Sequence, residues 1–242
     1  MNPATENPGP GTLYGLGIGP GDPELITLKA LKYLRSVSVL AYPAPMKGKS
    51  MARRIAESHL PGGQKEIVIH TTYDENRQPA EAAYDQAADE ISGHLSEGRD
   101  VALLCLGDPF LYGSFQYLFA RLGDRFPVEV VPGVSAPAAG SAAAQLALAA
   151  GNDCLALIPA TLDENVIAAR LEGFDAAVIV KIGRHFAKLY GLLKRLDLAE
   201  KACYVERVSM AEERILPLDQ VNPDSASYFS MILFHNREGA SS

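Results

Sequence analysis

The stretch LYGLGIGPGDPELITLKAL, residues 13–31, decides the fold, because an apolar run passes through closely spaced glycines into a Gly-Asp-Pro turn and then into a helical pattern. The tripeptide recurs in LLCLGDPFLYGSFQYLF, residues 103–119, again directly after an apolar run. Glycine permits a sharp exit from a strand, Asp caps the helix that follows, and Pro suits its first position. We therefore expect two similar strand-to-helix turns, at Asp22 and Asp108.

The first of these turns is not a phosphate-binding loop. A dinucleotide fingerprint needs Gly-x-Gly-x-x-Gly, but counting from Gly15 the sixth position is Pro20. Counting from Gly17 it is Asp22, and no Gly-Lys-Ser/Thr follows. Pro20 and Pro23 also lack amide donors, and Asp22 brings negative charge to the place where an anion would bind. The sequence thus opposes a pyridine-nucleotide oxidoreductase.

Short apolar and β-branched runs alternate with helical patterns in the first half of the chain. The strands expected there are 13–18, 36–42, 65–71, 100–106 and 128–133. A helical pattern covers 79–98. Such a βαβ succession predicts a mostly parallel sheet with helices on its faces.

The rhythm changes after about residue 150, where strand patterns outnumber helical ones. The strands expected there are 154–160, 175–182, 201–208, 213–218 and 228–236, with helices at about 163–171 and 185–196. We infer a second α/β domain with a more mixed sheet. The sequence therefore predicts an α/β fold of two domains, residues 11–125 and 126–242.

The composition describes an ordinary soluble globule, with 242 residues of which 48% are apolar and 21% charged. The formal net charge of −7 opposes a broad nucleic-acid surface. The opening MNPATENPGPG shows neither a basic leader nor a hydrophobic signal core. The apolar stretch 136–151, which we expect to be a helix, is shorter than the roughly 20 residues that span a bilayer. These features predict a cytoplasmic protein with no nucleic-acid or membrane partner.

The cysteines predict neither a disulfide framework nor a thiolate metal site, and no metal site is expected. Cys105, Cys154 and Cys203 each stand alone in apolar surroundings. We expect three buried thiols.

Three segments together, GLGIGPGDPELITLKAL, LGDPFLYGSF and VVPGVSAPAAGSAAA, resemble the tetrapyrrole methylase family of S-adenosylmethionine-dependent enzymes. The later segments LALIPATL, AAVIVKIGRHFAKL, YVERVSMAEERILPL and YFSMILF resemble the subgroup that methylates C20 of precorrin-2. The similarity runs from about residue 12 to 235. It implies two α/β domains with a ligand cleft between them, a homodimer, and S-adenosylmethionine bound in the cleft. The implied reaction gives precorrin-3A and S-adenosylhomocysteine in cobalamin biosynthesis.

The resemblance also implies where the cofactor binds. Carried over residue by residue, the family's cofactor contacts fall on Pro20, Leu106, Gly107, Asp108, Leu111, Ser135, Ala136, Ile182 and Val208. Uroporphyrinogen III methyltransferases carry an acidic residue after the second strand, whereas this chain has Pro43 there. That difference opposes their activity for this chain.

The implied substrate carries many carboxylates, so its pocket is expected to offer Arg or Lys. The candidates are Lys47, Lys49, Arg53, Lys181, Arg184 and Lys188. For Lys49 and Lys188 we favour a solvated surface position, and for substrate binding we choose Arg184 and Lys47. No catalytic residue is assigned. The conceivable bases are Tyr42, Asp108, Tyr112 and His185, and a structural role is the simpler interpretation of the tyrosines and the histidine.

Several alternatives stay open at the level of sequence. The substrate is either metal-free precorrin-2, which we choose, or its cobalt complex in the anaerobic route. Other relatives of this fold methylate ribosomal RNA or a modified translation-factor histidine, and the acidic charge and the second half of the chain oppose both. A non-catalytic nucleotide-binding module is the remaining alternative.

Overall fold

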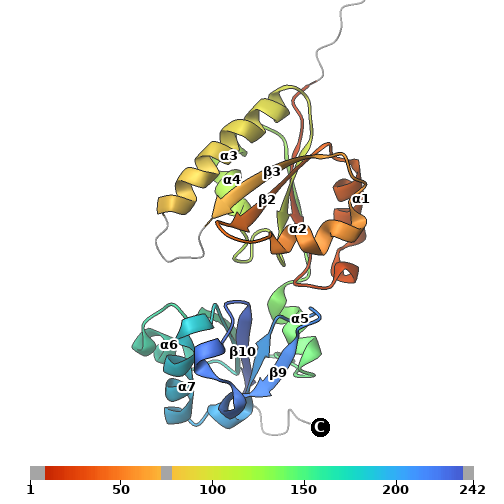
Figure 1. Cartoon of the computed structure of the whole chain (residues 1–242). Coiled ribbons are helices and arrows are strands. Elements are labelled where there is room, and N and C mark those ends of the chain that lie inside the picture. The colour runs from red at the N-terminus through yellow and green to blue at the C-terminus, as the bar shows by residue number, and fades with distance from the viewer. Residues whose placement is uncertain (1–8, 72–77, 237–242) are drawn as a thin grey trace, which may run out of the picture. The chain divides into compact units, whose positions relative to one another are not determined.

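The computed structural model describes residues 9–71 and 78–236 and divides into two compact units, Met1–Ser135 and Ala136–Ser242 (Figure 1). Each unit contains a five-stranded sheet. The boundary lies later than the one expected between residues 125 and 126. The reason is that β5 (Val128–Val131) pairs with β1 (Leu13–Gly17) and completes the first sheet.

The first sheet has the strand order β3-β2-β4-β1-β5, and all of its pairings are parallel. Its other strands are β2 (Val39–Pro45), β3 (Lys65–Thr71) and β4 (Val101–Cys105). The five strands expected in this half are confirmed, as is the parallel sheet. Parallel neighbours require crossover connections, which the helices between the strands supply.

Helices cover both faces of the first sheet. They are α1 (Leu28–Ser36), α2 (Met51–Ala56), α3 (Gln78–Ser96) and α4 (Phe115–Leu122). Helices α3 and α4 pack on one face, and α1 and α2 pack on the other (Figure 1). All residues of β4 are buried, which explains its uninterrupted apolar sequence VALLC.

The first Gly-Asp-Pro turn forms as predicted but starts only a short helix. The Asp22 carboxylate accepts a hydrogen bond from the Glu24 amide at 2.8 Å and caps the 3-10 helix η1 (Pro23–Leu25). The α-helix that follows has its own cap, because Thr27 Oγ1 accepts from the Ala30 amide at 3.2 Å.

The second sheet is mixed, as predicted, with the order β6-β7-β10-β8-β9. Its strands are β6 (Leu155–Pro159), β7 (Ala176–Val180), β8 (Ala202–Glu206), β9 (Arg214–Pro217) and β10 (Ser230–His235). Strands β6 and β7 are parallel, whereas β10 runs antiparallel to both β7 and β8. Strands β7 and β8 therefore end at the same edge. All five strands expected here are confirmed.

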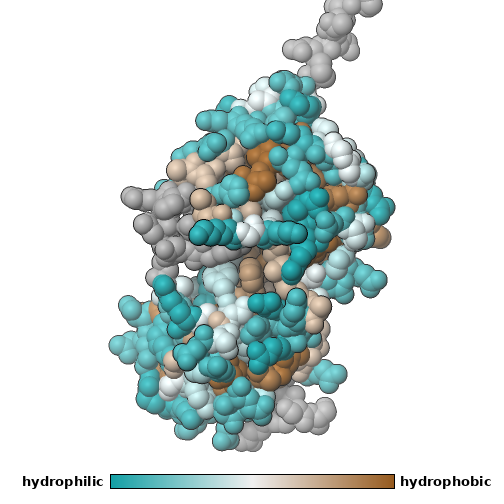
Figure 2. Space-filling view, in the orientation of Figure 1, coloured by the Kyte–Doolittle hydropathy of each residue, from teal (hydrophilic) through white to brown (hydrophobic). Residues whose placement is uncertain are grey.

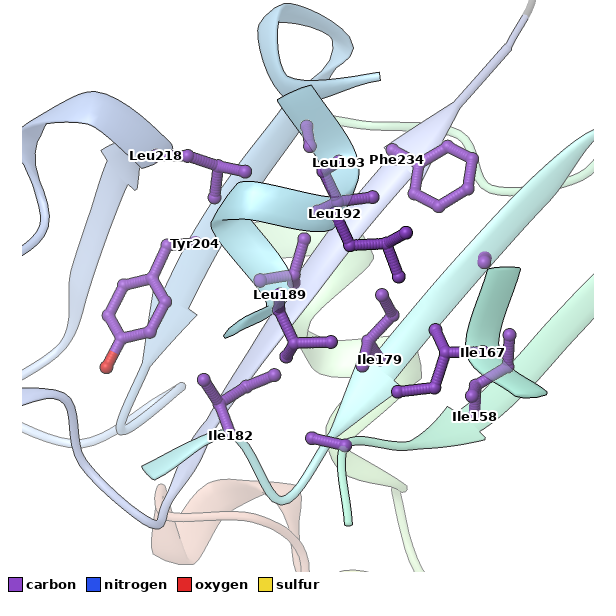
Figure 3. Close-up of a cluster of buried hydrophobic side chains, with 14 of the residues drawn as sticks. Ile158, Ile167, Ile179, Ile182, Leu189, Leu192, Leu193, Tyr204, Leu218 and Phe234 are labelled. Carbon is purple, nitrogen blue, oxygen red and sulfur yellow. The ribbon is translucent and has the colours of Figure 1, made fainter. Parts of the chain in front are cut away.

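The second unit buries its core beneath α6 (Glu164–Leu171) and α7 (Phe186–Arg195). In Figure 3, side chains from α7, β7 and β10 point toward one another, among them Leu189, Ile179 and Phe234. This packing explains the apolar spacing that predicted both helices.

A third helix of the second unit, α5 (Ala136–Ala143), packs against β10, where Gly140 faces the Met231 side chain. The helix expected over 136–151 is wrong beyond Ala143. Gln145 adopts a left-handed conformation with a φ of 51°, and the Leu146 amide donates to the Ser141 carbonyl, so the helix ends there.

The visible surface of both units is largely hydrophilic with scattered apolar patches (Figure 2). Within the described residues, no helix combines the length and apolarity needed to cross a bilayer. Cys105 is buried and burial raises the pKa of its thiol to about 12. The expectation of three buried thiols is wrong for Cys154, which is exposed just before β6, and for Cys203, which is only half-buried.

Candidate functional site

The loops that follow β1 and β4 meet at a topological switch point. These strands are neighbours, yet β1 leads to β2 beyond β4, whereas β4 leads to β5 beyond β1. In open α/β sheets, ligands bind outside the carboxyl ends of the strands at such a point. The two loops are joined here, because Gly107 N donates to Gly19 O at 2.8 Å and Gly19 N donates to Gly107 O at 3.4 Å.

Three glycines bring the carboxyl ends of β1, β4 and β5 into backbone contact. A Cβ atom added at Gly17 would lie closer than 3.0 Å to the backbone of Gly133. One added at Gly133 would come as close to the carbonyl of Gly107, whose φ is 67°. These positions therefore require glycine for the packing of the loops themselves.

Asp108 ties these loops together. Its Oδ1 accepts hydrogen bonds from the amides of Phe110 at 2.9 Å and Leu111 at 3.0 Å. Its Oδ2 accepts from the Gly133 amide, beyond β5, at 3.1 Å. Asp108 therefore caps a turn rather than a helix, since α4 begins only at Phe115. This corrects the expected helix start directly after the second Gly-Asp-Pro.

The turn after Asp108 exposes apolar side chains. Phe110, Leu111 and Tyr112 are 50%, 44% and 47% exposed, and Tyr112 is left-handed with a φ of 56°. The Phe110 ring also lies 5.4 Å from the Phe119 ring, edge to face. The switch point thus combines a carboxylate, close backbone and an apolar rim.

The structure brings most of the expected cofactor residues of the first unit to this switch point. Pro20 is buried and directly follows Gly19, and Leu106 and Asp108 flank Gly107, the partner of Gly19. Ser135 is the last residue of the first unit. Ala136 is the first residue of the second unit and of α5.

Two further expected cofactor residues of the second unit, Ile182 and Val208, follow β7 and β8. Ile182 is fully buried and packs in the hydrophobic cluster of Figure 3, and Val208 is 4% exposed. Each follows a charged residue in a left-handed conformation, Lys181 with a φ of 61° and Arg207 with a φ of 50°.

Tyr42 and Arg53 form a network with Glu66 beside β2 and β3. The Tyr42 hydroxyl donates to Glu66 Oε2, and Arg53 Nε donates to both carboxylate oxygens at 3.1 Å. Burial, with the Glu66 carboxylate, raises the pKa of Tyr42 to about 12. Tyr42 is therefore protonated near neutral pH and unsuited to act as a base. Arg53 is occupied by Glu66 and is a poor candidate for a substrate carboxylate.

The other cationic candidates lie in different surroundings. Lys47 and Lys49 are exposed after β2, and Arg184 is exposed in the 3-10 helix η3 (Gly183–His185). Lys188 Nζ instead donates to two backbone carbonyls that follow β6, at 2.8 and 2.7 Å. The solvated position expected for Lys188 is therefore wrong, because this ammonium closes a loop.

The sequence interpretation did not single out Glu206 and Arg207 at the end of β8. Glu206 is 7% exposed, and its Oε1 lies 3.6 Å from Arg207 Nε. The signal was present in the segment YVERV, where an opposite charge pair interrupts an apolar strand at its carboxyl end.

The chain is a two-unit α/β protein. Its first unit has a parallel sheet with a glycine-rich switch point, and its second unit has a mixed sheet. The family described as Tetrapyrrole (Corrin/Porphyrin) Methylases matches residues 12–221. The chain belongs to this family, which confirms the resemblance inferred from its motifs.

Curated relatives refine this placement. The cobalamin biosynthesis protein CobIJ of Mycobacterium tuberculosis is 42% identical over 92% of this chain, but the match covers 46% of that protein. The chain thus spans about half the length of the mycobacterial relatives it matches. The precorrin-2 C(20)-methyltransferase of a Sinorhizobium species is 37% identical over 93% of this chain and 95% of its own. The cobalt-precorrin-2 C(20)-methyltransferase of Salmonella typhimurium is 34% identical over 94% and 97%.

Solved structures share the fold. A cobalt precorrin-4 methyltransferase has a TM-score of 0.73 at 20% identity, covering 93% of this chain and 94% of its own. Uroporphyrin-III C-methyl transferase from Thermus thermophilus, complexed with S-adenyl homocysteine, has a TM-score of 0.65 at 23% identity, covering 93% and 97%. The predicted fold class is therefore confirmed.

Proposed function

We propose that the protein is an S-adenosylmethionine-dependent methyltransferase that methylates C20 of precorrin-2 in cobalamin biosynthesis. The products are precorrin-3A and S-adenosylhomocysteine. The observation that carries the proposal is the 37% identity to a precorrin-2 C(20)-methyltransferase over nearly the full length of both chains. Membership of the tetrapyrrole methylase family supports it.

The switch point of the first unit fits the proposed cofactor. S-adenosylmethionine joins a flat adenine and ribose hydroxyls to a cationic sulfonium, so it needs apolar surface, close backbone and anionic or carbonyl acceptors. The exposed Phe110 and Leu111 offer apolar surface, and the buried, left-handed Gly107 offers backbone without a side chain. Asp108 offers a carboxylate whose orientation its three amide donors fix.

The proposed cofactor contacts remain those expected from the sequence. They are Pro20, Leu106, Gly107, Asp108, Leu111, Ser135, Ala136, Ile182 and Val208.

When bound, the cofactor supplies a methyl group already activated by the sulfonium. The protein's own task is then to hold the acceptor carbon in line with that methyl group and to exclude water. Alignment of this kind contributes on the order of 7–11 kcal/mol to catalysis. No nucleophilic side chain is required, and Tyr42 is set aside as a base because its pKa is raised to about 12.

The substrate's carboxylates require cations, and we propose Arg184 and Lys47 for this role because both are exposed. The proposal also includes a homodimer in the cytoplasm. Analytical ultracentrifugation tests the dimer, and a sedimentation coefficient that corresponds to a single chain contradicts it.

Anaerobic incubation of the purified protein with precorrin-2 and S-adenosylmethionine tests the activity. We expect a product in which one hydrogen is replaced by one methyl group, with C20 as the modified carbon by nuclear magnetic resonance. Methylation at another carbon contradicts the regiochemistry. Absence of both turnover and S-adenosylhomocysteine binding contradicts the proposed function.

The cobalt complex of precorrin-2 is the second candidate substrate, and the 34% identity to the Salmonella typhimurium enzyme favours it. We choose the metal-free compound because the segments VERVSMAEERI and YFSMILF resemble the enzymes that use it. Parallel assays with both compounds at matched concentration decide between them. Faster turnover of the cobalt complex overturns this choice and leaves the methyl donor unaffected.

A further inference from the structure

The chain turns sharply where β8 ends. Arg207 and Ser209 have φ values of 50° and 60°, in the left-handed region that residues other than glycine seldom adopt. Arg207 N donates to Phe229 O at 2.8 Å, and Ser209 N donates to Glu213 Oε2 at 2.6 Å. These hydrogen bonds hold the segment from Arg207 to Ser209, which we call the β8 elbow.

A buried carboxylate lies directly before the elbow. Glu206 is 7% exposed, and the Tyr204 hydroxyl donates to its Oε2 at 2.8 Å. The same hydroxyl accepts from the Ser227 amide at 3.1 Å, so the Tyr204 ring and the Glu206 carboxylate are both fixed. A buried carboxylate needs such partners, and a nearby cation compensates its charge.

The Arg207 guanidinium is held through its inner nitrogen. Nε lies 3.6 Å from Glu206 Oε1, within ion-pair range but beyond hydrogen-bond distance. Nε is buried, and among the described residues no atom accepts a hydrogen bond from it. The whole Arg207 side chain is nevertheless 41% exposed. The Arg207 side chain therefore extends from a fixed backbone to the surface, and its buried Nε is a donor without a hydrogen-bond acceptor among the described residues.

The elbow shares its sheet edge with two further cations. Strands β7 and β8 are parallel with β10 between them, so their ends lie about 10 Å apart, or two strand spacings. Lys181 and Arg184 follow β7. Gly183 N donates to Ser227 O at 3.1 Å, while the elbow binds Phe229, so both loops are attached to the segment that precedes β10.

We propose that Arg207 binds a carboxylate group of the ligand and that Glu206 is the residue that positions its guanidinium. The inference rests on the proposed function, which offers two sources of carboxylate: the acidic side chains of the tetrapyrrole and the amino-acid end of S-adenosylmethionine. The planar guanidinium fork suits either source, because it matches two carboxylate oxygens at once.

The arrangement tolerates a second carboxylate although Glu206 already faces Arg207. Glu206 faces the Nε side of the guanidinium. A ligand carboxylate can bind the other side, where Nη1 and Nη2 each offer a donor. The nearby acid Glu213 accepts the Ser209 amide, and Lys181 adds positive charge at the same edge. Lys181 and Arg184 therefore add two cations to the sheet edge that Arg207 shares.

The Arg207→Gln and Arg207→Lys variants test the binding role. We measure the KM of precorrin-2 and, by calorimetry, the Kd of S-adenosylhomocysteine. Arg207→Gln is expected to raise one of these two constants at least about tenfold while kcat changes less, and Lys should restore part of the loss. The constant that changes identifies the source of the carboxylate. Arg170→Gln, in the exposed last turn of α6, is the matched control and should change neither.

The Glu206→Gln variant tests the positioning role, because the amide keeps the shape of the side chain but removes its charge. It should raise the same constant as Arg207→Gln, by a smaller factor, and have no further effect in the Arg207→Gln background. A merely structural role would lower the melting temperature and impair both ligands in either background.

Ligand binding without turnover separates the role of Arg207 from the proposed methylation reaction. Binding of uroporphyrin III, an octacarboxylate tetrapyrrole, and of S-adenosylhomocysteine is measured for the wild type and Arg207→Gln, without requiring turnover. A folded Arg207→Gln protein with unchanged affinity for both probes overturns the inference, and so does a wild type that binds neither. A wild type that binds them but does not methylate precorrin-2 contradicts only the proposed reaction.

Discussion

The two sheets end in loops that are built differently. In the first unit, Gly17, Gly107 and Gly133 let the ends of three strands pack backbone against backbone. In the second unit, the loops after β7 and β8 carry Lys181 and Arg207, both left-handed without being glycine. In the first unit, glycine lets the backbones of the loops come into direct contact. In the second unit, the left-handed residues keep their charged side chains, and hydrogen bonds to neighbouring segments must hold their backbone in place.

This difference predicts where each unit is sensitive to mutation. Adding atoms at the first edge should disrupt the packing of the strand ends and hence stability. Removing charge at the second edge should affect ligand binding and leave the strands in place, because β8 and β10 are held by their own register.

The Gly133→Ala variant should have the largest effect. The new methyl group would overlap the Gly107 carbonyl, and backbone on both sides prevents simple relief. We expect a loss of roughly 3 kcal/mol in the free energy of unfolding, measured by urea denaturation.

The matched control is Gly93→Ala in α3, because a Cβ atom there meets no other atom within 4 Å. Alanine in a helix interior should stabilise the protein by roughly 0.5–1 kcal/mol. An equal loss in the free energy of unfolding for Gly133→Ala and Gly93→Ala would show that the packing of the strand ends does not require glycine.

The Asp108→Ala variant should have the next largest effect, since it removes the acceptor of three backbone amides. We expect a loss of about 2 kcal/mol in stability and weaker S-adenosylhomocysteine binding by calorimetry. Asp22→Ala, which removes one amide acceptor at a short 3-10 helix, should cost about 1 kcal/mol or less. A folded Asp108→Ala protein with unchanged affinity would assign Asp108 to loop structure alone.

Sequence patterns predicted most of the fold, because strand burial leaves a direct mark on residue choice. The uninterrupted apolar run of β4 reflects burial on both faces, and the β-branched runs of the second half gave all five of its strands. The end of α5 was missed, since the alanine-rich stretch to residue 151 has helix-forming residues throughout. A left-handed Gln145 stops the helix, and composition does not reveal that conformation.

The candidate site was less predictable, because it depends on contacts between distant segments. The role of Asp108 as an acceptor for Gly133 could not be read from local sequence, which suggested only a helix cap. Arg53, on α2, looked like a substrate cation until its partner Glu66, on β3, was located. Glycine motifs predicted the switch point correctly, since close backbone approach restricts those positions to glycine.

The Arg184→Ala variant tests the charged edge of the second unit. If Arg184 pairs with a substrate carboxylate, tetrapyrrole binding should weaken by more than about 1 kcal/mol, the upper range for exposed ion pairs. Cofactor affinity should not change. An unaltered KM for the tetrapyrrole would remove Arg184 from the substrate site and leave Lys181 and Arg207 as the cations of this edge to examine.

The smallest effect concerns Tyr42, whose hydroxyl is bound to Glu66 and should therefore affect stability alone. Its pKa in the folded protein is raised to about 12, above the ordinary value of 10.0, because of burial and the Glu66 carboxylate. The folded state thus retains the phenolic proton more strongly, and this contribution is fully present below pH 10 and is lost as the pH rises toward 12. At acid pH the sign reverses for Glu66. Hydrogen bonding by Arg53 lowers its pKa, and its contribution to stability is lost as the pH falls below about 4.5.

Urea unfolding at matched pH tests the contribution of Tyr42. Wild-type stability should fall more steeply than that of Tyr42→Phe between pH 10 and 12. Parallel stability curves for the two proteins above pH 10 would show that the phenol makes no such contribution.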